Sequence, residues 1–306
     1  LFDKILVFRH KLKLNIFKSP ISEFKAILFK LHHFKAIFLF KSFNWKKNPL
    51  FDKSKEFKIY GFTSFSNKKI QFHSANLLKK IKEYKNPWNS NNVFKYSISN
   101  NLKDDLINIF DNGVDDFIKS VYKSDYCLFS HSIYKSKREN DDQIPVGSEL
   151  WHADGYPGTS LNLMICHTPI NELNGSMKII PWKQSKKLLS KLYFDYKQFI
   201  RYQSFLDPID SKNREIYREF KCDMLKKYIE NQSIKYFQAR SDKSGTIFAF
   251  TNNCVHAGGY TNVNCERIVS LFQVYPSVKI TCLKSKFENI KINTLKMPKL
   301  NNIFNT

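Results

Sequence analysis

The chain has 306 residues and a net charge of +23, and lysine makes up most of its basic residues. Six cysteines without a Cys-x-x-Cys pair argue against a disulfide scaffold and a zinc ribbon, and they favour a reducing compartment, so we expect a cytoplasmic protein. The basic residues are dispersed and no arginine-rich or aromatic-stacking motif accompanies them, which argues against nucleic-acid binding.

Residues 1–50 form a basic N-terminal segment in which lysine mixes with aromatic and aliphatic residues at roughly helical spacing. It contains no run of 18 uncharged apolar residues, which argues against a membrane span. Two interpretations remain open. We favour a helix packed on the catalytic domain or on a partner, and the alternative is a basic amphipathic helix that makes peripheral membrane contact through residues 1–47.

Apolar residues then recur at helical spacing over residues 102–122, interrupted by Gly113, which predicts one or two amphipathic helices. A strand is expected next, at residues 126–134. Extended apolar segments follow at 161–166, 245–250 and 266–276. Residues 174–181 begin with a turn and continue with alternating polar and apolar residues, the pattern of a strand.

These strands predict a β-domain spanning residues 51–285. The stretch at 182–240 is rich in Lys, Tyr and Phe and predicts a mainly helical insertion between two halves of the β-core. Residues 286–306 are expected to be a polar tail with little core of its own.

Two histidines and one aspartate are the candidates for a metal site. His152 and Asp154 lie two residues apart, so in a strand both side chains point the same way and can reach one ion. His256 follows an apolar strand far downstream and supplies a third candidate ligand. Two imidazoles and one carboxylate on one face are the ligand set of non-haem iron(II) oxygenases. A His-x-Asp pair alone is a weak signal, because most such pairs are polar surface residues.

Four sequence blocks give the pair its context: WHAD at 151–154, NGSMKIIP at 174–181, GTIFAFTNNCVHAGG at 245–259 and ERIVSLFQVYP at 266–276. In this order they resemble the phytanoyl-CoA dioxygenase family of iron- and 2-oxoglutarate-dependent oxygenases. The resemblance covers about residues 100–280.

The resemblance implies that His152, Asp154 and His256 bind Fe(II), and that Arg267 holds the far carboxylate of the cosubstrate 2-oxoglutarate, with O₂ as the second cosubstrate. An arginine suits this role because a guanidinium forks onto a carboxylate, whereas a lysine offers a point charge. The resemblance places further residues near the cosubstrate or on the strand lining the site: Asn162, His167, Thr168 and Lys135.

Some positions depart from the family pattern or admit a second interpretation. Residues 182–185 replace a Gly-Ser-His sequence beside the site, so substrate contacts do not transfer, and Ala153 stands where glutamine is frequent. His167 fits equally well as a strand-end histidine satisfied by the backbone. His131 is better explained as a core or pocket-wall residue than as an additional metal ligand.

The expected fold is mainly β with flanking helices, namely a double-stranded β-helix, a jelly roll related to the cupins. The expected function is hydroxylation of a small or medium-sized organic molecule, with release of succinate and CO₂. The alternative is a non-catalytic member of the same fold that binds metal or ligand. A basic scaffold associated with nucleic acid is a third interpretation and predicts salt-sensitive binding.

Overall fold

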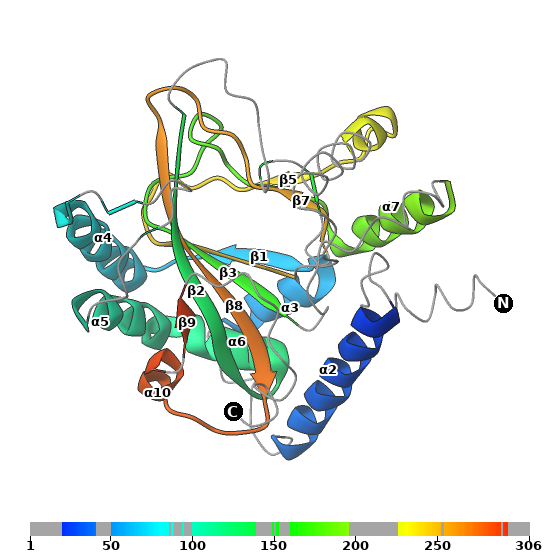
Figure 1. Ribbon diagram of the computed structural model, residues 1–306, viewed down its shortest axis with the longest axis horizontal. Coiled ribbons are helices and arrows are strands. Elements are labelled where there is room, and N and C mark those ends of the chain that lie inside the picture. The colour runs from blue at the N-terminus through cyan, green and yellow to red at the C-terminus, as the bar shows by residue number, and fades with distance from the viewer. Residues whose placement is uncertain are drawn as a thin grey trace.

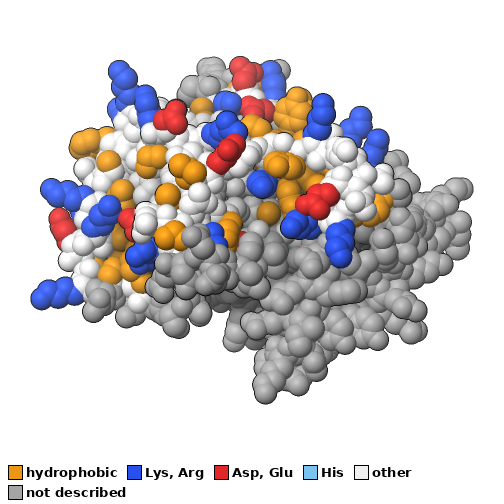
Figure 2. Space-filling model, turned by 90° about the horizontal axis from the view of Figure 1, so that it is seen from above, with side chains coloured by type: hydrophobic (Ala, Val, Ile, Leu, Met, Phe, Trp, Pro, Cys, Tyr) orange, Lys and Arg blue, Asp and Glu red, His pale blue; other side chains and the backbone are white. Residues whose placement is uncertain are grey.

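The computed structural model describes residues 20–40, 50–85, 87–88, 94, 100–138, 149, 151–152, 160–195, 226–251, 254–288 and 290–292. No helix in these ranges is long and apolar enough to span a bilayer. The face shown in Figure 2 carries Lys and Arg side chains scattered among apolar and acidic ones, in line with the dispersed lysines of the sequence.

Two β-sheets form the centre of the described chain. The larger sheet has the order β1-β6-β3-β8-β2-β9 and is antiparallel except for the β2–β9 pair. Its strands are β1 (Phe62–Phe65), β2 (Asp125–Lys137), β3 (Leu161–Cys166), β6 (Thr246–Thr251), β8 (Glu266–Ser277) and β9 (Lys291–Ile292). The smaller sheet is antiparallel, in the order β5-β4-β7, and consists of β4 (Lys178–Ile179), β5 (Phe237–Gln238) and β7 (His256–Ala257).

Helices cover one face of the larger sheet, and β5 and β7 lie on its other side (Figure 1). The covering helices are α3 (Phe51–Tyr60), α4 (Lys68–Glu83), α5 (Asn100–Ile109) and α6 (Asp115–Tyr122). Their apolar side chains pack on the side chains of Leu161, Leu163 and Ile165 of β3 in one buried cluster. We call this the helix face of the larger sheet.

The opposite face of the larger sheet, the inner face, is buried as well. Met164, Cys166 and Phe248 of this face pack with Ile179 of β4 in a second apolar cluster. Partners directly opposite in a sheet point to the same side, so the register assigns the other inner positions. Met164 faces Leu271, and Ser136 faces Arg267.

The one or two helices predicted over residues 102–122 are present as two, α5 and α6. Between them lies a widened turn, η2 (Phe110–Val114). Gly113 adopts φ +123° there, a left-handed conformation that costs glycine little and other residues more. The glycine therefore lets the chain bend while Phe110 and Val114 stay in the core.

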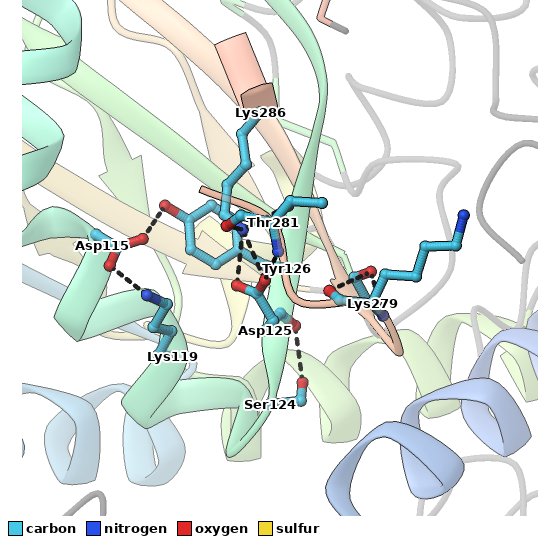
Figure 3. A network of polar contacts seen from close by, with 9 residues as sticks. Asp115, Lys119, Ser124, Asp125, Tyr126, Lys279, Thr281 and Lys286 are labelled. Atoms are coloured by element: carbon cyan, nitrogen blue, oxygen red, sulfur yellow. Dashed lines mark hydrogen bonds and ion pairs between the residues drawn. The ribbon is translucent and has the colours of Figure 1, made fainter. Parts of the chain in front are cut away.

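The first residues of the tail predicted at 286–306 contribute to the core, and residues 293–306 lie outside the described part of the chain. Helix α10 (Leu283–Glu288) packs Phe287 into the core, and β9 pairs with β2. Lys286 Nζ lies 2.7 Å from Asp125 Oδ1 and 2.8 Å from the carbonyl oxygen of Thr281, and it lies over the ring of Tyr126 (Figure 3). This buried ion pair joins α10 to the start of β2, a contact that polar composition does not reveal.

Two other predicted regions are partly described. The expected insertion at 182–240 begins as helix α7 (Trp182–Asp195), and residues 196–225 lie outside the described part of the chain. Residues 226–231 are helical, and β5 near the end of the range pairs with β4 in the smaller sheet. The mainly helical character of the whole insertion stays a prediction. From the N-terminal segment, helix α2 (Pro20–Leu39) packs on the domain, where His33 Nε2 lies 2.9 Å from the carbonyl oxygen of Tyr122.

Candidate functional site

Two of the three predicted metal ligands lie side by side. His152 and His256 form an antiparallel bridge, in which each backbone N–H donates to the carbonyl of the other at 2.8 Å. Directly paired residues point to one side, so both rings emerge together, and their centroids are 4.3 Å apart. Both side chains are buried. The pairing brings together two histidines that are about a hundred residues apart in sequence.

His256 starts β7 in the smaller sheet, a short strand separate from the apolar strand β6 that precedes it. Ile179 of β4 is its partner on the other side. The ring of Phe250, an inner-face residue of β6, lies 5.0 Å from the His256 ring. The imidazole therefore sits between the two sheets, beside an apolar wall.

The backbone fixes which nitrogen of His256 carries the proton. Its Nδ1 lies 2.8 Å from the carbonyl oxygen of Cys254. A carbonyl only accepts, so Nδ1 must donate, and the lone pair of the neutral ring is on Nε2. A ring oriented by a backbone carbonyl is the usual arrangement for a metal-binding histidine. In this tautomer Nε2 is the acceptor nitrogen of the His256 ring.

Arg267 is a buried cation on the inner face of β8. Its Nη1 donates to the carbonyl of Gly258, and its Nη2 donates to Ser136 Oγ at 3.1 Å. Its Nε has no hydrogen-bond partner among the described residues, and burial lowers the pKa of the guanidinium, although Cys166 and Glu149 oppose that shift. A buried cation with an unsatisfied donor is costly unless an anion binds there. These features fit the carboxylate expected at Arg267.

The loop between His256 and Arg267 is held by a close backbone approach. Gly259 adopts φ +72°, and a side-chain Cβ at this position would lie 2.2 Å from the carbonyl oxygen of Ser176. Only glycine fits there without a shift of backbone. The approach fixes the neighbouring Gly258 carbonyl, which in turn receives the Arg267 guanidinium.

Asn162 lies in β3 on the inner face, and Thr168 follows two residues after the end of that strand. Thr168 Oγ1 accepts a hydrogen bond of 3.1 Å from the backbone N–H of Ile268, next to Arg267. Asn162 is buried opposite Gln273. Thr168 therefore fixes the backbone that carries Arg267, and Asn162 belongs to the inner face farther along the sheet.

His167 and Lys135 do not join this group, contrary to the sequence expectation. His167 is buried on the helix face, where its ring contacts Ser74 Oγ of α4 and Ser270 Oγ of β8, each at 2.8 Å. The hydrogen-bond partners of its two ring nitrogens are therefore serine hydroxyls, whereas the second sequence interpretation expected backbone groups. Lys135 pairs with the helix-face residue Ile268 and points over Trp88, with Nζ 5.2 Å from the ring centroid.

Asp154 lies outside the described residues. Within the described ranges, which leave it out, no three His, Cys, Asp or Glu side chains form a metal-binding group. His131 stacks on Phe272 on the helix face at 4.2 Å, and burial lowers its pKa to about 3. It is a core residue, as the sequence interpretation preferred.

Sequence reasoning missed the groups that orient the candidate ligands. Ser136 binds Arg267 because antiparallel pairing places it directly opposite, and that register is not readable from either strand alone. The carbonyls of Cys254 and Gly258 act through the backbone, so no residue type marks them. Only the tertiary arrangement brings them to the site.

No model of a known protein family matches the sequence, and no curated protein matches it. Among solved structures, the chain is similar to SnoN, a non-heme alpha ketoglutarate dependent epimerase from nogalamycin biosynthesis. The identity is 13% over 76% of this chain and 88% of that chain, with a TM-score of 0.48. It is also similar to EctD from S. alaskensis with 2-oxoglutarate and 5-hydroxyectoine, at 12% identity over 74% of this chain and 75% of that chain, with a TM-score of 0.45.

Proposed function

We propose that this protein is an Fe(II)- and 2-oxoglutarate-dependent dioxygenase that hydroxylates a small or medium-sized organic molecule. The observation that carries the proposal is the His152–His256 bridge, which places two buried imidazoles together and sets the tautomer of one of them. The two facing sheets agree with the proposed double-stranded β-helix of this class.

In this proposal His152 and His256 bind iron with Asp154, and Arg267 binds the far carboxylate of 2-oxoglutarate. When bound, iron(II) with 2-oxoglutarate and O₂ supplies the oxidation of a substrate C–H bond, with release of succinate and CO₂. The protein holds the two imidazoles in fixed orientation and keeps the Arg267 charge out of water, which strengthens its attraction for an anion.

Arg267 also explains why the cosubstrate would be an organic acid with an extended carboxylate. A guanidinium has five N–H donors, and Gly258 and Ser136 occupy two of them. The remaining donors include Nε, which the described residues leave unsatisfied. Two parallel hydrogen bonds to one carboxylate would satisfy this group.

The test is anaerobic titration of the purified protein with Fe(II) and 2-oxoglutarate, following the weak visible charge-transfer band of the chelated complex. We expect a band in the wild type, no band in His256→Ala, and a weakened band in Arg267→Ala. His73→Ala is a matched control, because His73 contacts Asp105 between α4 and α5. A folded wild type without a band would reject the proposal.

A second measurement separates the dioxygenase from the non-catalytic alternative. Under air, with Fe(II) and ascorbate present, conversion of 2-oxoglutarate to succinate is measured in the absence of added substrate. Slow succinate formation that His256→Ala abolishes supports turnover. A chelation band without any succinate would favour a binding protein of the same fold.

A further inference from the structure

Helix α2 carries a second apolar face that points away from the protein. Its inner side packs on the domain, with His32, Ala36 and Phe40 buried. On the other side, the side chains of Leu31, Phe34 and Phe38 are 57%, 52% and 75% exposed, and Leu39 beside them is 53% exposed. With about 3.6 residues per turn, the first three fall within about 60° around the helix axis. We call Leu31, Phe34 and Phe38 the outer stripe of α2.

The outer stripe gathers exposed apolar side chains on one side of a single helix. Of the eleven large hydrophobic side chains exposed in the described residues, four lie between positions 31 and 39. Single exposed apolar residues are normal, whereas adjacent ones indicate a contact surface. The helix is therefore held on the domain by one face and offers the other to a partner.

Positive charge borders the outer stripe on both sides. Lys30 and Lys35 each lie about 40° beyond its edge on a helical projection, and Lys30 Nζ is 5.3 Å from the centroid of the Phe34 ring. In the sequence, residues 1–49 contain eleven Lys and Arg and only two acidic residues, Asp3 and Glu23. A partner for this surface must accept apolar side chains beneath a negatively charged layer.

An anionic lipid surface has an apolar interior beneath a layer of negatively charged headgroups, as this surface requires. A second copy of the chain is a poorer match, because it would bring identical lysines and another +23 charge against this surface. Aromatic and aliphatic side chains flanked by lysine are the pattern of helices that lie in the membrane interface. We propose that α2 docks the protein on anionic membranes, with the outer stripe in the interface and Lys30 and Lys35 at the headgroups. The contact between His33 and Tyr122 of α6 would then hold the domain in one orientation on the membrane.

The proposal is tested by flotation of the full chain with phosphatidylcholine vesicles and with vesicles containing one quarter phosphatidylserine, at 0.1 M and 0.5 M NaCl. We expect at least tenfold stronger binding to the anionic vesicles, reduced at high salt. Phe34→Ser combined with Phe38→Ser should lower that binding at least tenfold. Each of Lys30→Gln and Lys35→Gln should lower it about fivefold.

Matched controls lie on α4, away from the stripe. Phe72→Ser removes one comparably exposed aromatic ring, and Lys69→Gln and Lys79→Gln each remove one charge from an exposed position. These variants should float like wild type. Flotation that the Phe34/Phe38 variant retains, or no flotation of wild type, would overturn the proposal. The proposal would also be overturned if the wild type were a dimer that bound no vesicles and the Phe34/Phe38 variant were a monomer. Because the assay contains no iron or 2-oxoglutarate, its result is independent of the proposed activity.

Discussion

Replacing Arg267 with lysine keeps the positive charge and removes the forked guanidinium. In the structure, two donors of Arg267 bind the Gly258 carbonyl and Ser136 Oγ, and Nε has no partner among the described residues. A lysine ammonium has three donors. If two of them keep the existing partners, one remains, so a carboxylate loses one of its two parallel hydrogen bonds.

That loss sets the size of the expected effect. A hydrogen bond to a charged group contributes about 1.5–3 kcal/mol, and a loss of about 2 kcal/mol weakens binding about thirtyfold. At a 2-oxoglutarate concentration of about 100 times the wild-type Kd, ligand binding stabilises the wild type by about 2.7 kcal/mol. The same concentration should stabilise Arg267→Lys by about 0.9 kcal/mol.

The assay is anaerobic calorimetric titration with 2-oxoglutarate in the presence of Mn(II), together with thermal unfolding at fixed ligand concentration. Ser136→Ala tests the supporting contact and should weaken binding by less than Arg267→Lys. If Arg267→Lys binds 2-oxoglutarate as tightly as the wild type, the carboxylate is not held at Arg267, and the reasoning is refuted.

Three further predictions address other parts of the molecule. Lys286→Ala should lower the free energy of unfolding in urea by about 3–5 kcal/mol, because it leaves Asp125 buried without its partner; an unchanged midpoint would contradict this. His131→Leu should stabilise the protein at pH 7 by about 1–3 kcal/mol, since neither ring nitrogen of His131 has a hydrogen-bond partner among the described residues. Burial lowers the pKa of His131 to about 3 from an ordinary value of 6.5. Stability should therefore fall as the pH drops from about 6.5 toward 3, because the unfolded chain takes up the proton first. His131→Leu should flatten that fall, and identical pH dependence in both proteins would count against the assignment. Lys135→Gln should leave 2-oxoglutarate affinity unchanged, because Lys135 points over Trp88; a tenfold loss would restore the sequence expectation.

The amino-acid sequence determined the local elements well where a strong pattern was present. The strand expected at 161–166 is β3, and the helices over 102–122 separate around Gly113 as their interrupted spacing indicates. The sequence also offered His152 and His256 as candidate ligands through its resemblance to the oxygenase family, and the structure pairs their backbones in one bridge. That these two histidines and Asp154 bind a metal stays a prediction.

The tertiary structure decided which way each side chain points. All six residues of β3 are buried, because helices cover one face of the larger sheet and the smaller sheet lies over the other. Burial on both faces removes the polar and apolar alternation from which an inner face could be recognised. The sequence therefore could not separate Thr168 from His167 at the end of β3. Lys135 and Ser136 of β2 are both polar and both partly buried, so alternation does not separate them either. Pairing register makes that separation, since a shift of one residue exchanges the two faces of a strand.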